Sequence, residues 1–235
     1  PMVQGYPGQA GIWFQGDPGI IKDYLEFNPV GIVTNTLVLD GLVDTYGPML
    51  GVIERYLELD NDGPVVVEVD GDTTEDIVNA SAPFQALSER VVMKIPSTSK
   101  GFRAIARMKA NGRESMVTTL FSASQAVAAV QVGATYIAPF VGPLIDSGAD
   151  ARAIVSDIVQ VVRGRANQPY VLGGIIRNWI AADVALRAGC DGVVVFPHHF
   201  EEMMIHAGTS EWNATFRGHW DNMVDKGALD GVIDD

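Results

Sequence analysis

One lysine stands inside an apolar segment of this sequence, where a charge is costly. Lys94 is flanked by the apolar residues 91–93 and 95–96. Burial disfavours the charged form of an ammonium group and lowers its pKa unless a partner compensates. A neutral amine attacks carbonyl carbons and forms a Schiff base, so Lys94 is a candidate catalytic nucleophile. The alternative is a lysine whose long side chain carries its amine out to solvent.

Other polar side chains end apolar segments elsewhere in the chain. Glu68 follows three valines, Thr118 lies in a later apolar segment, and Gln15 and Asn35 end two earlier ones. Carboxylate and hydroxyl partners at neighbouring strand ends favour chemistry at Lys94 over simple exposure to solvent. A second interpretation of Glu68 is a structural ion pair with Lys94.

Eight short apolar segments rich in β-branched residues recur along the chain, each followed by a segment long enough for a helix. Continuous apolar strands of this kind are typical of a parallel sheet covered on both faces. Eight strand–helix repeats in 235 residues match the size of a (β/α)8 barrel. The expected strands are residues 11–15, 30–35, 64–69, 90–95, 115–120, 134–140, 169–175 and 191–196.

The sequence therefore predicts an α/β fold, a (β/α)8 TIM barrel with an extra C-terminal helix, in a single domain over residues 1–235. In such a barrel, the active site lies at the carboxyl ends of the strands. A doubly wound open sheet is the alternative, but residues 14–19 after the first strand lack the GxGxxG pattern of its phosphate loop. The extra helix, residues 208–226, has an aromatic stripe that we expect to pack on the barrel or on a neighbouring subunit. The stripe consists of Trp212, Phe216 and Trp220.

The composition argues against several classes of protein. Apolar residues make up 47% of the chain, enough for a core, which excludes intrinsic disorder. A net charge of −13 makes nucleic acids and anionic membranes poor partners. No apolar run approaches the ~18 residues of a transmembrane helix, and we expect no signal peptide. The single cysteine, Cys190, excludes an intrachain disulfide and indicates a buried thiol in a reducing cytoplasm.

The segment that begins at Lys94 resembles a known catalytic motif. Residues 94–101, Lys-Ile-Pro-Ser-Thr-Ser-Lys-Gly, look like the catalytic-lysine segment KIPxTxxG of the transaldolase family. The short-chain branch of that family, which includes the bacterial fructose-6-phosphate aldolases, matches in size. The resemblance runs from about residue 12 to residue 205, in family order and spacing. Its other elements are residues 33–35, Glu68, Thr118, residues 121–126, residues 138–142 and Arg177.

The resemblance implies a mechanism. Lys94 would form an imine with a donor ketone, a carbon–carbon bond would break, and a three-carbon enamine would remain until it adds to an acceptor aldehyde. Glu68 and Thr118 would hold a proton-shuttling water, and Asn35 would bind donor hydroxyls. No metal and no cofactor are implied, because the protonated imine is itself the electron sink. Short-chain members form pentamers or decamers through a C-terminal helix, which implies a homo-oligomer here. The remaining substrate-binding candidates are Gln15, Thr34, Phe140 and Arg177.

Thr36 stands where proline is usual in the family, and three further departures from the family pattern are serious. Gln15 stands at or beside a first-strand aspartate that moves the proton of the hydroxyl next to the cleaved bond, and an amide cannot act as a general base. Pro143 and Ile175 stand in place of an arginine and a serine that bind substrate phosphate. These two replacements predict a less charged substrate end. Arg177 alone remains of the phosphate-binding group, either as an anion site or as a solvent-exposed residue.

Three function hypotheses follow from these residues. The first is a cytoplasmic, transaldolase-like enzyme that transfers a three-carbon ketol unit between sugars or sugar phosphates, which the family pattern at Glu68 and Phe140 favours over simple cleavage. The second is a class I, lysine-dependent aldolase or carbon–carbon bond-forming enzyme acting on a non-phosphorylated carbonyl substrate. The third is a non-catalytic barrel that binds a ligand. His198 and His199 either supply a replacement acid–base group or form the polar start of the eighth helix.

Overall fold

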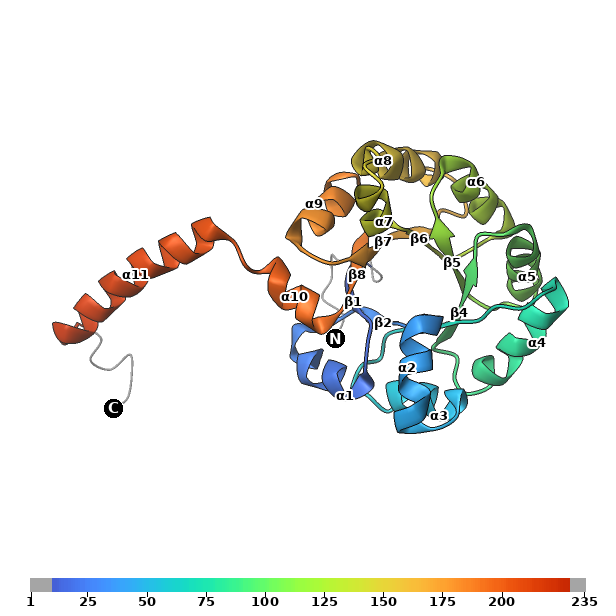
Figure 1. Ribbon diagram of the computed structural model, residues 1–235, viewed down its shortest axis with the longest axis horizontal. Coiled ribbons are helices and arrows are strands. Elements are labelled where there is room, and N and C mark those ends of the chain that lie inside the picture. The colour runs from blue at the N-terminus through green and yellow to red at the C-terminus, as the bar shows by residue number, and fades with distance from the viewer. Residues whose placement is uncertain (1–9, 229–235) are drawn as a thin grey trace.

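Eight parallel strands close into a barrel in the computed structural model, which describes residues 10–228 (Figure 1). Each strand pairs with the next along the chain, and β8 pairs with β1 to close the ring. The predicted (β/α)8 TIM barrel is confirmed. The predicted domain, 1–235, also includes residues 1–9 and 229–235, which lie outside the described residues. The strands are β1 (Gly11–Phe14), β2 (Gly31–Val33), β3 (Val65–Glu68), β4 (Val91–Pro96), β5 (Ser115–Leu120), β6 (Tyr136–Pro139), β7 (Tyr170–Ile176) and β8 (Gly192–Val195).

Helices form a ring around the strands (Figure 1). Polar residues start several of them, as at Thr73 and Thr98, whose side chains accept hydrogen bonds from the first turns of α4 and α5. The helices are α1 (Pro18–Ile21), the 3-10 helix η1 (Lys22–Phe27), α2 (Thr36–Tyr46), α3 (Met49–Leu57), α4 (Thr74–Gln85), α5 (Ser99–Ala110), α6 (Ala123–Val132), α7 (Val141–Asp146), α8 (Ala151–Val162), α9 (Trp179–Arg187), α10 (Pro197–Met203) and α11 (Ala207–Asp225).

The barrel interior is filled by a compact cluster of apolar side chains, at least one from every strand. Successive side chains of a strand point to opposite faces, so the residue two positions beyond each cluster member faces the interior again. These next residues form the layer in which the polar candidates lie, nearer the carboxyl ends of the strands. The cluster consists of Trp13, Val33, Val66, Val92, Met116, Tyr136, Ala138, Leu172 and Val194.

Cys190 belongs to the outer core between strands and helices, as expected from its apolar surroundings. Burial raises the pKa of its thiol to about 12, and the neighbouring Asp191 adds to the effect. The thiol therefore stays protonated near neutral pH and acts as a packing residue.

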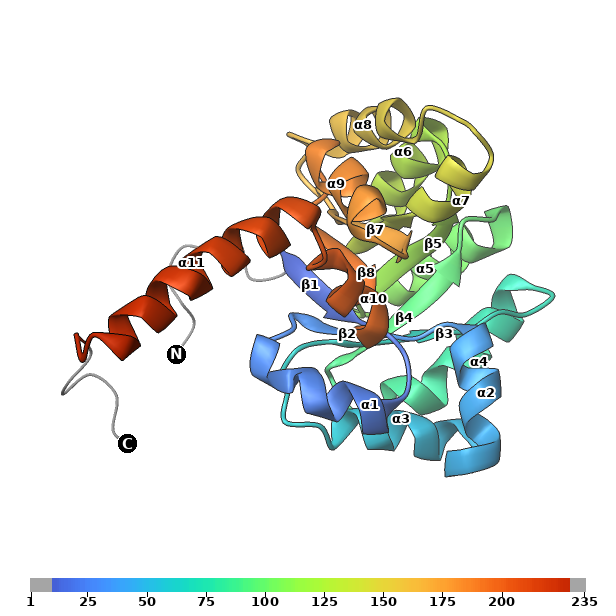
Figure 2. The ribbon, with the colours of Figure 1, turned by 60° about the vertical axis from the view of Figure 1, so that its left-hand side comes forward.

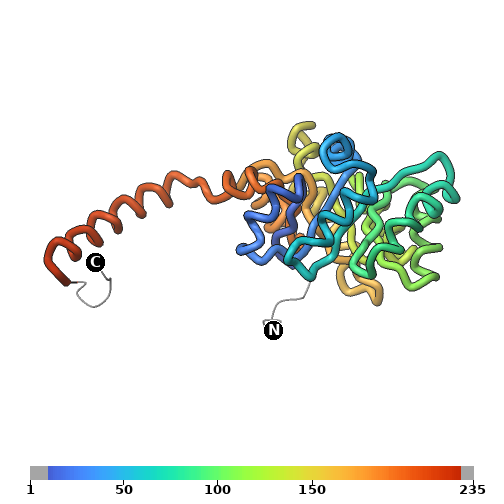
Figure 3. The backbone as a smooth tube through the Cα atoms, turned by 90° about the horizontal axis from the view of Figure 1, so that it is seen from below, coloured from blue at the N-terminus to red at the C-terminus, as the bar shows by residue number. Residues whose placement is uncertain are grey.

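The last helix, α11, extends away from the barrel (Figures 1, 2 and 3). None of its side chains is buried, and its aromatic stripe faces solvent, with Trp212 and Phe216 each about 60% exposed. The two rings pack on each other with centroids 5.4 Å apart. The helix therefore does not cover its own barrel, and contact with a neighbouring subunit stays a prediction.

Among the described residues, no single helix combines the length and the apolar character needed to cross a membrane. Helices α2 and α3 pass that test only when they are taken together, and they meet at a bend of 95°.

Candidate active site

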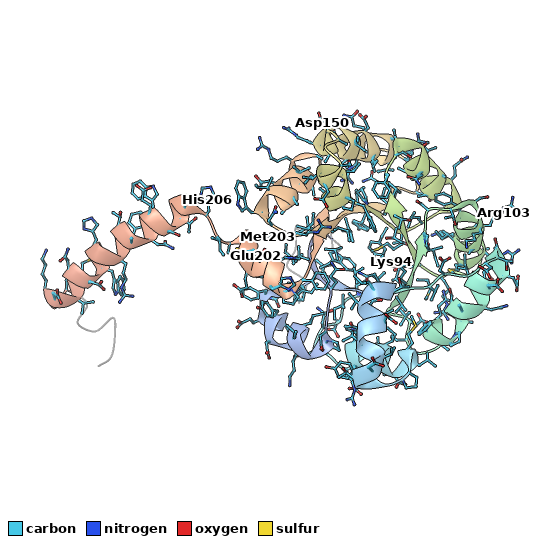
Figure 4. The ribbon with its side chains drawn as sticks, in the orientation of Figure 1. Lys94, Arg103, Asp150, Glu202, Met203 and His206 are labelled. Atoms are coloured by element: carbon cyan, nitrogen blue, oxygen red, sulfur yellow. The ribbon has the colours of Figure 1, made fainter. Side chains whose placement is uncertain are left out.

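Lys94 and Glu68 form a buried ion pair inside the barrel. They are direct register partners on β4 and β3, so their side chains leave the sheet on the same side. Lys94 Nζ lies 2.8 Å from Glu68 Oε2 and donates a hydrogen bond to the carbonyl oxygen of Thr34 at 2.9 Å. Lys94 is only 5% exposed, and Figure 4 shows it within the ring of strands. Its amine therefore stays inside the barrel and does not extend to solvent.

Burial lowers the pKa of Lys94 below the ordinary value of a lysine amine, and the Glu68 carboxylate partly opposes that shift. The cause is the loss of hydration, which penalises the ammonium form more than the neutral amine. A larger fraction of Lys94 is thus neutral, and nucleophilic, than of a lysine at the surface.

Thr118 brings a hydroxyl to the same cavity. Thr118 lies on β5, the strand that pairs with the Lys94 strand β4, and its side chain is fully buried. Its Oγ1 has no hydrogen-bond partner among the described residues. A buried hydroxyl without a partner costs about 1–3 kcal/mol, so such groups are usually satisfied by a water or a ligand. The position of Thr118 fits a group that holds a reacting molecule.

Gln15 and Asn35 are linked to each other across β1 and β2. Asn35 Nδ2 donates a hydrogen bond to Gln15 Oε1 at 3.2 Å, while Asn35 Oδ1 accepts one from the backbone of Val38 and caps α2. The cap fixes the orientation of the Asn35 amide, which in turn holds Gln15. Both residues lie on the wall of the Lys94 cavity. The pair provides amide groups that can bind hydroxyls, but no group that takes up a proton at neutral pH.

These residues surround one cavity of about 240 Å³ at the carboxyl ends of the strands. For every strand except β8, a residue that lies two positions after a member of the apolar cluster in the barrel interior lines the cavity, either in the strand or just beyond its end. The other lining residues are mostly apolar. The full set is Gln15, Val33, Asn35, Thr36, Leu37, Glu68, Lys94, Thr118, Thr119, Ala138, Phe140, Gly174, Ile175 and Val194.

Two other predicted site residues, Thr34 and Arg177, do not line this cavity. Thr34 contributes only its backbone carbonyl to the site, since its hydroxyl donates to the carbonyl of Val66 at 2.9 Å. Arg177 is half exposed and forms an ion pair with Asp146 at 2.6 Å, in a neighbouring pocket of about 160 Å³.

The histidines of α10 also lie outside the cavity wall. His198 and His199 occupy the first turn of that helix and contact the ring of Phe196. They therefore form the polar start of the helix. A wider surface groove, between α1 and α3, holds none of the candidate residues.

Sequence reasoning missed several members of the wall. Thr36 and Leu37 open α2 directly after Asn35, so their position next to a strand end was a usable signal. The placement of Thr119 and Ile175 on the wall could not be predicted in this way. Both residues have a positive φ, of 52° and 57°, which breaks the regular alternation of side chains along a strand. The Arg177–Asp146 pair joins the residue after β7 to the last residue of α7, 31 positions away in the sequence, and no local pattern indicates it.

Comparison with known proteins identifies the family. A family model described as Transaldolase/Fructose-6-phosphate aldolase matches residues 36–232, which include Glu68, Lys94 and Thr118. The chain belongs to this family. The matched region begins directly after Asn35, so it includes neither Asn35 nor Gln15.

Similar curated proteins carry the name "Probable transaldolase". Those of Streptococcus agalactiae and Moorella thermoacetica are each 28% identical over 89% of this chain and 98% of their own length. One from Methanococcus maripaludis is 29% identical over 87% of this chain and 95% of its own. This member of the family is therefore an enzyme of transaldolase or aldolase type, which argues against a non-catalytic barrel.

Proposed function

We propose that Lys94 forms a Schiff base with a small ketone, and that the resulting enamine transfers or creates a carbon–carbon bond. The observation that carries the proposal is the buried Lys94 amine, 2.8 Å from Glu68, beside the unpartnered hydroxyl of Thr118. A structural ion pair needs no such hydroxyl and no cavity. The three groups together support nucleophilic catalysis on a carbonyl.

The reaction has a defined sequence of bonds. The neutral Lys94 amine adds to the ketone carbon, and the carbonyl oxygen leaves as water when the C=N bond forms. The protonated imine withdraws electrons from the adjacent carbon, which becomes an enamine when it loses either a proton or an aldehyde fragment. The enamine carbon then attacks the acceptor aldehyde, whose oxygen takes up a proton. Hydrolysis of the imine releases the product and restores Lys94.

Glu68 is the proton carrier that we propose for these steps. On the cavity wall, as far as the structure describes it, Glu68 and Lys94 are the only ionisable side chains. Gln15 cannot accept the proton, and the α10 histidines lie elsewhere. A water between the Glu68 carboxylate and the Thr118 hydroxyl would complete a path from the reacting atoms to the carboxylate.

Transfer of a three-carbon ketol unit between sugars is the activity that we place first. The names of the relatives support it, as do Glu68 and the phenyl ring of Phe140 on the cavity wall. Aldol addition to a non-phosphorylated aldehyde is the second candidate. It is favoured by Gln15 in the place of a carboxylate and by the apolar part of the wall.

A turnover assay tests the proposal. The protein is supplied with dihydroxyacetone or fructose 6-phosphate as donor and with a panel of aldehydes as acceptors, and ketose products are quantified. The parent should form product, and Lys94→Met should form none. Lys100→Met is the matched control, because the Lys100 amine binds Gly71 and Asp70 outside the cavity. Product formation by Lys94→Met, or none by the parent with any pair, would contradict the proposal.

We also propose that the chain assembles as a homo-oligomer through α11, in a cytoplasmic setting. The exposed aromatic stripe of that helix supports assembly, and the single cysteine supports a reducing compartment. The number of subunits, a pentamer or a decamer, stays a prediction from the resemblance.

A further inference from the structure

Ile175 forms part of the cavity wall in a backbone conformation that branched residues rarely adopt. Its φ of 57° lies in the left-handed region, where a β-branched side chain is an outlier. The pairing of β7 with β8 shifts register between Gly173 and Ile176, so Ile175 sits within an irregular part of the strand. Strained residues persist where their surroundings hold them, and they cluster at ligand-binding sites. The Ile175 side chain is therefore fixed on the wall at a conformational cost.

Apolar side chains gather around this position. Leu37, Phe140 and Val194 line the same cavity as Ile175, and Leu37 is 81% exposed. Phe140 makes an edge-to-face contact with the half-exposed ring of Phe121, with ring centroids 5.6 Å apart. A single exposed apolar residue is ordinary, but a group of them beside a reactive amine indicates a surface that meets apolar atoms of a ligand.

No unpaired cation reaches this part of the cavity. Lys94 is the only positively charged residue on the described wall, and its charge is matched by Glu68. Arg177 lies in the adjoining pocket, which shares Ile175 with the Lys94 cavity, but Asp146 holds its guanidinium at 2.6 Å. A phosphate group entering here would have to displace that carboxylate, within a chain of net charge −13.

We propose that the acceptor aldehyde carries an uncharged, apolar substituent that packs against Ile175, Leu37 and Phe140. This inference rests on the proposed Schiff-base function and selects its second candidate, aldol addition to a non-phosphorylated aldehyde, because an acceptor with an apolar substituent is not a sugar. The enamine carbon on Lys94 forms the new bond to the aldehyde carbon, the aldehyde oxygen becomes a hydroxyl by taking a proton, and water releases the ketone product. The cavity of about 240 Å³ is smaller than the roughly 300–1,000 Å³ typical of sites for drug-sized ligands. It therefore suits a short alkyl chain beside the three-carbon donor.

Steady-state kinetics with three acceptors test the inference. Dihydroxyacetone is the donor, and the acceptors are butanal, glyceraldehyde and glyceraldehyde 3-phosphate. The neutral polar glyceraldehyde separates the effect of polarity from that of charge. We expect kcat/KM to be at least about tenfold higher for butanal than for either of the other two, because each methylene matched by an apolar pocket contributes roughly a factor of ten or more.

Two variants locate the preference in the structure. Ile175→Ser should lower the ratio of kcat/KM for butanal to that for glyceraldehyde by about tenfold or more, whereas the same change at Ile180, in the neighbouring pocket, should leave the ratio unchanged.

Asp146→Asn should raise kcat/KM for glyceraldehyde 3-phosphate about tenfold without altering that for butanal, since Arg177 would lose its competing carboxylate.

The outcomes separate this inference from the proposed function. Borohydride trapping of dihydroxyacetone on Lys94, carried out on the parent and on each variant, reports imine formation independently of any acceptor. If the parent traps the donor but prefers the phosphorylated aldehyde, or if Ile175→Ser traps it with an unchanged acceptor ratio, the inference is overturned and the function stands. If the parent traps no donor, both are overturned. An Ile175→Ser protein that fails to trap is replaced by Ile175→Ala, judged by the same ratio.

Discussion

Two opposing influences set the protonation of the Lys94 amine. Burial favours the neutral form, which attacks carbonyls, while Glu68 favours the ammonium form and so restores part of the pKa. The hydrogen bond to the carbonyl oxygen of Thr34, the residue after β2, holds the Lys94 amine at 2.9 Å from that oxygen, in either charge state. The proposed nucleophile is therefore positioned by the barrel, and its protonation is set by burial and by one carboxylate.

Replacement of Glu68 distinguishes an ion-pair partner from a proton carrier. Glu68→Gln removes the anion that raises the pKa of Lys94, so the pKa should fall further and the neutral amine should appear at lower pH. If Glu68 carries protons, single-turnover imine formation should nevertheless slow by about 10²-fold on the pH plateau. An unchanged or faster plateau rate would leave Glu68 as an electrostatic partner only.

Replacement of Thr118 should lower activity without lowering stability. Thr118→Val keeps the shape of the side chain and removes the unpartnered buried hydroxyl, so thermal stability should be unchanged or higher, by about 1 kcal/mol. Imine formation should slow at least about tenfold if the hydroxyl holds a reacting water. Thr118→Ser, which keeps the hydroxyl, is the control and should retain most of the rate. A Thr118→Val protein with the parental rate would remove Thr118 from the mechanism.

At the scale of elements, the pleat of the strands explains why the polar candidates meet. Glu68 lies two residues after Val66, and Lys94 lies two residues after Val92. Each polar side chain therefore faces the barrel interior next to an apolar side chain of the interior cluster. The apolar segments and their polar ends made this arrangement predictable from sequence. The same logic could not show that the Thr34 hydroxyl turns to the Val66 carbonyl, since that choice depends on the neighbouring strand.

The contact between α7 and β7 shows where prediction from sequence ends. Pro143 and Ile175 can be recognised from sequence as departures from a phosphate-binding pattern, but the positive φ of Ile175 and the Asp146 partner of Arg177 depend on tertiary contacts. A Cβ atom at Gly142 would overlap the carbonyl oxygen of Ile175. The absence of a side chain at Gly142 thus lets α7 approach β7 closely enough to hold Ile175 in place.

Gly142→Ala should therefore disturb both stability and the cavity wall. We expect a loss of about 1–3 kcal/mol in the free energy of unfolding, because backbone must move to admit the methyl group. The matched control is Gly41→Ala in α2, where an added Cβ meets nothing within 4 Å and should stabilise the helix by about 0.5–1 kcal/mol. Chemical denaturation of both variants measures the difference. Equal stabilities would mean that α7 and β7 adjust freely at this contact.

On the scale of the whole molecule, α11 is the part of the described chain that its own barrel leaves uncovered. Its aromatic side chains recur every four residues along one side of a helix that projects into solvent (Figure 2). A helix in this position gains stability mainly by packing, and we propose another copy of the chain as its packing partner. The acidic net charge of −13 limits non-specific association, so contact through the stripe should be specific.

A charge within the stripe should disrupt assembly. Phe216→Asp places a carboxylate where an apolar contact is expected, so the mass in solution measured by light scattering should fall toward that of the 25.2 kDa chain. Ala214→Asp, two residues away from Trp212 and on the opposite side of the helix, should keep the parental mass. A parental protein that is already monomeric would refute assembly through α11.

The covalent intermediate on Lys94 is the central claim, and mass spectrometry of the trapped protein tests it most directly. The protein is incubated with dihydroxyacetone, reduced with borohydride and digested, and the modified lysines are mapped. Lys94 should carry the reduced adduct nearly stoichiometrically, and Lys100 on the same segment, which is half-buried outside the cavity, should carry almost none. Modification spread evenly over both lysines, or absent from Lys94 across a broad panel of ketones, would contradict the account.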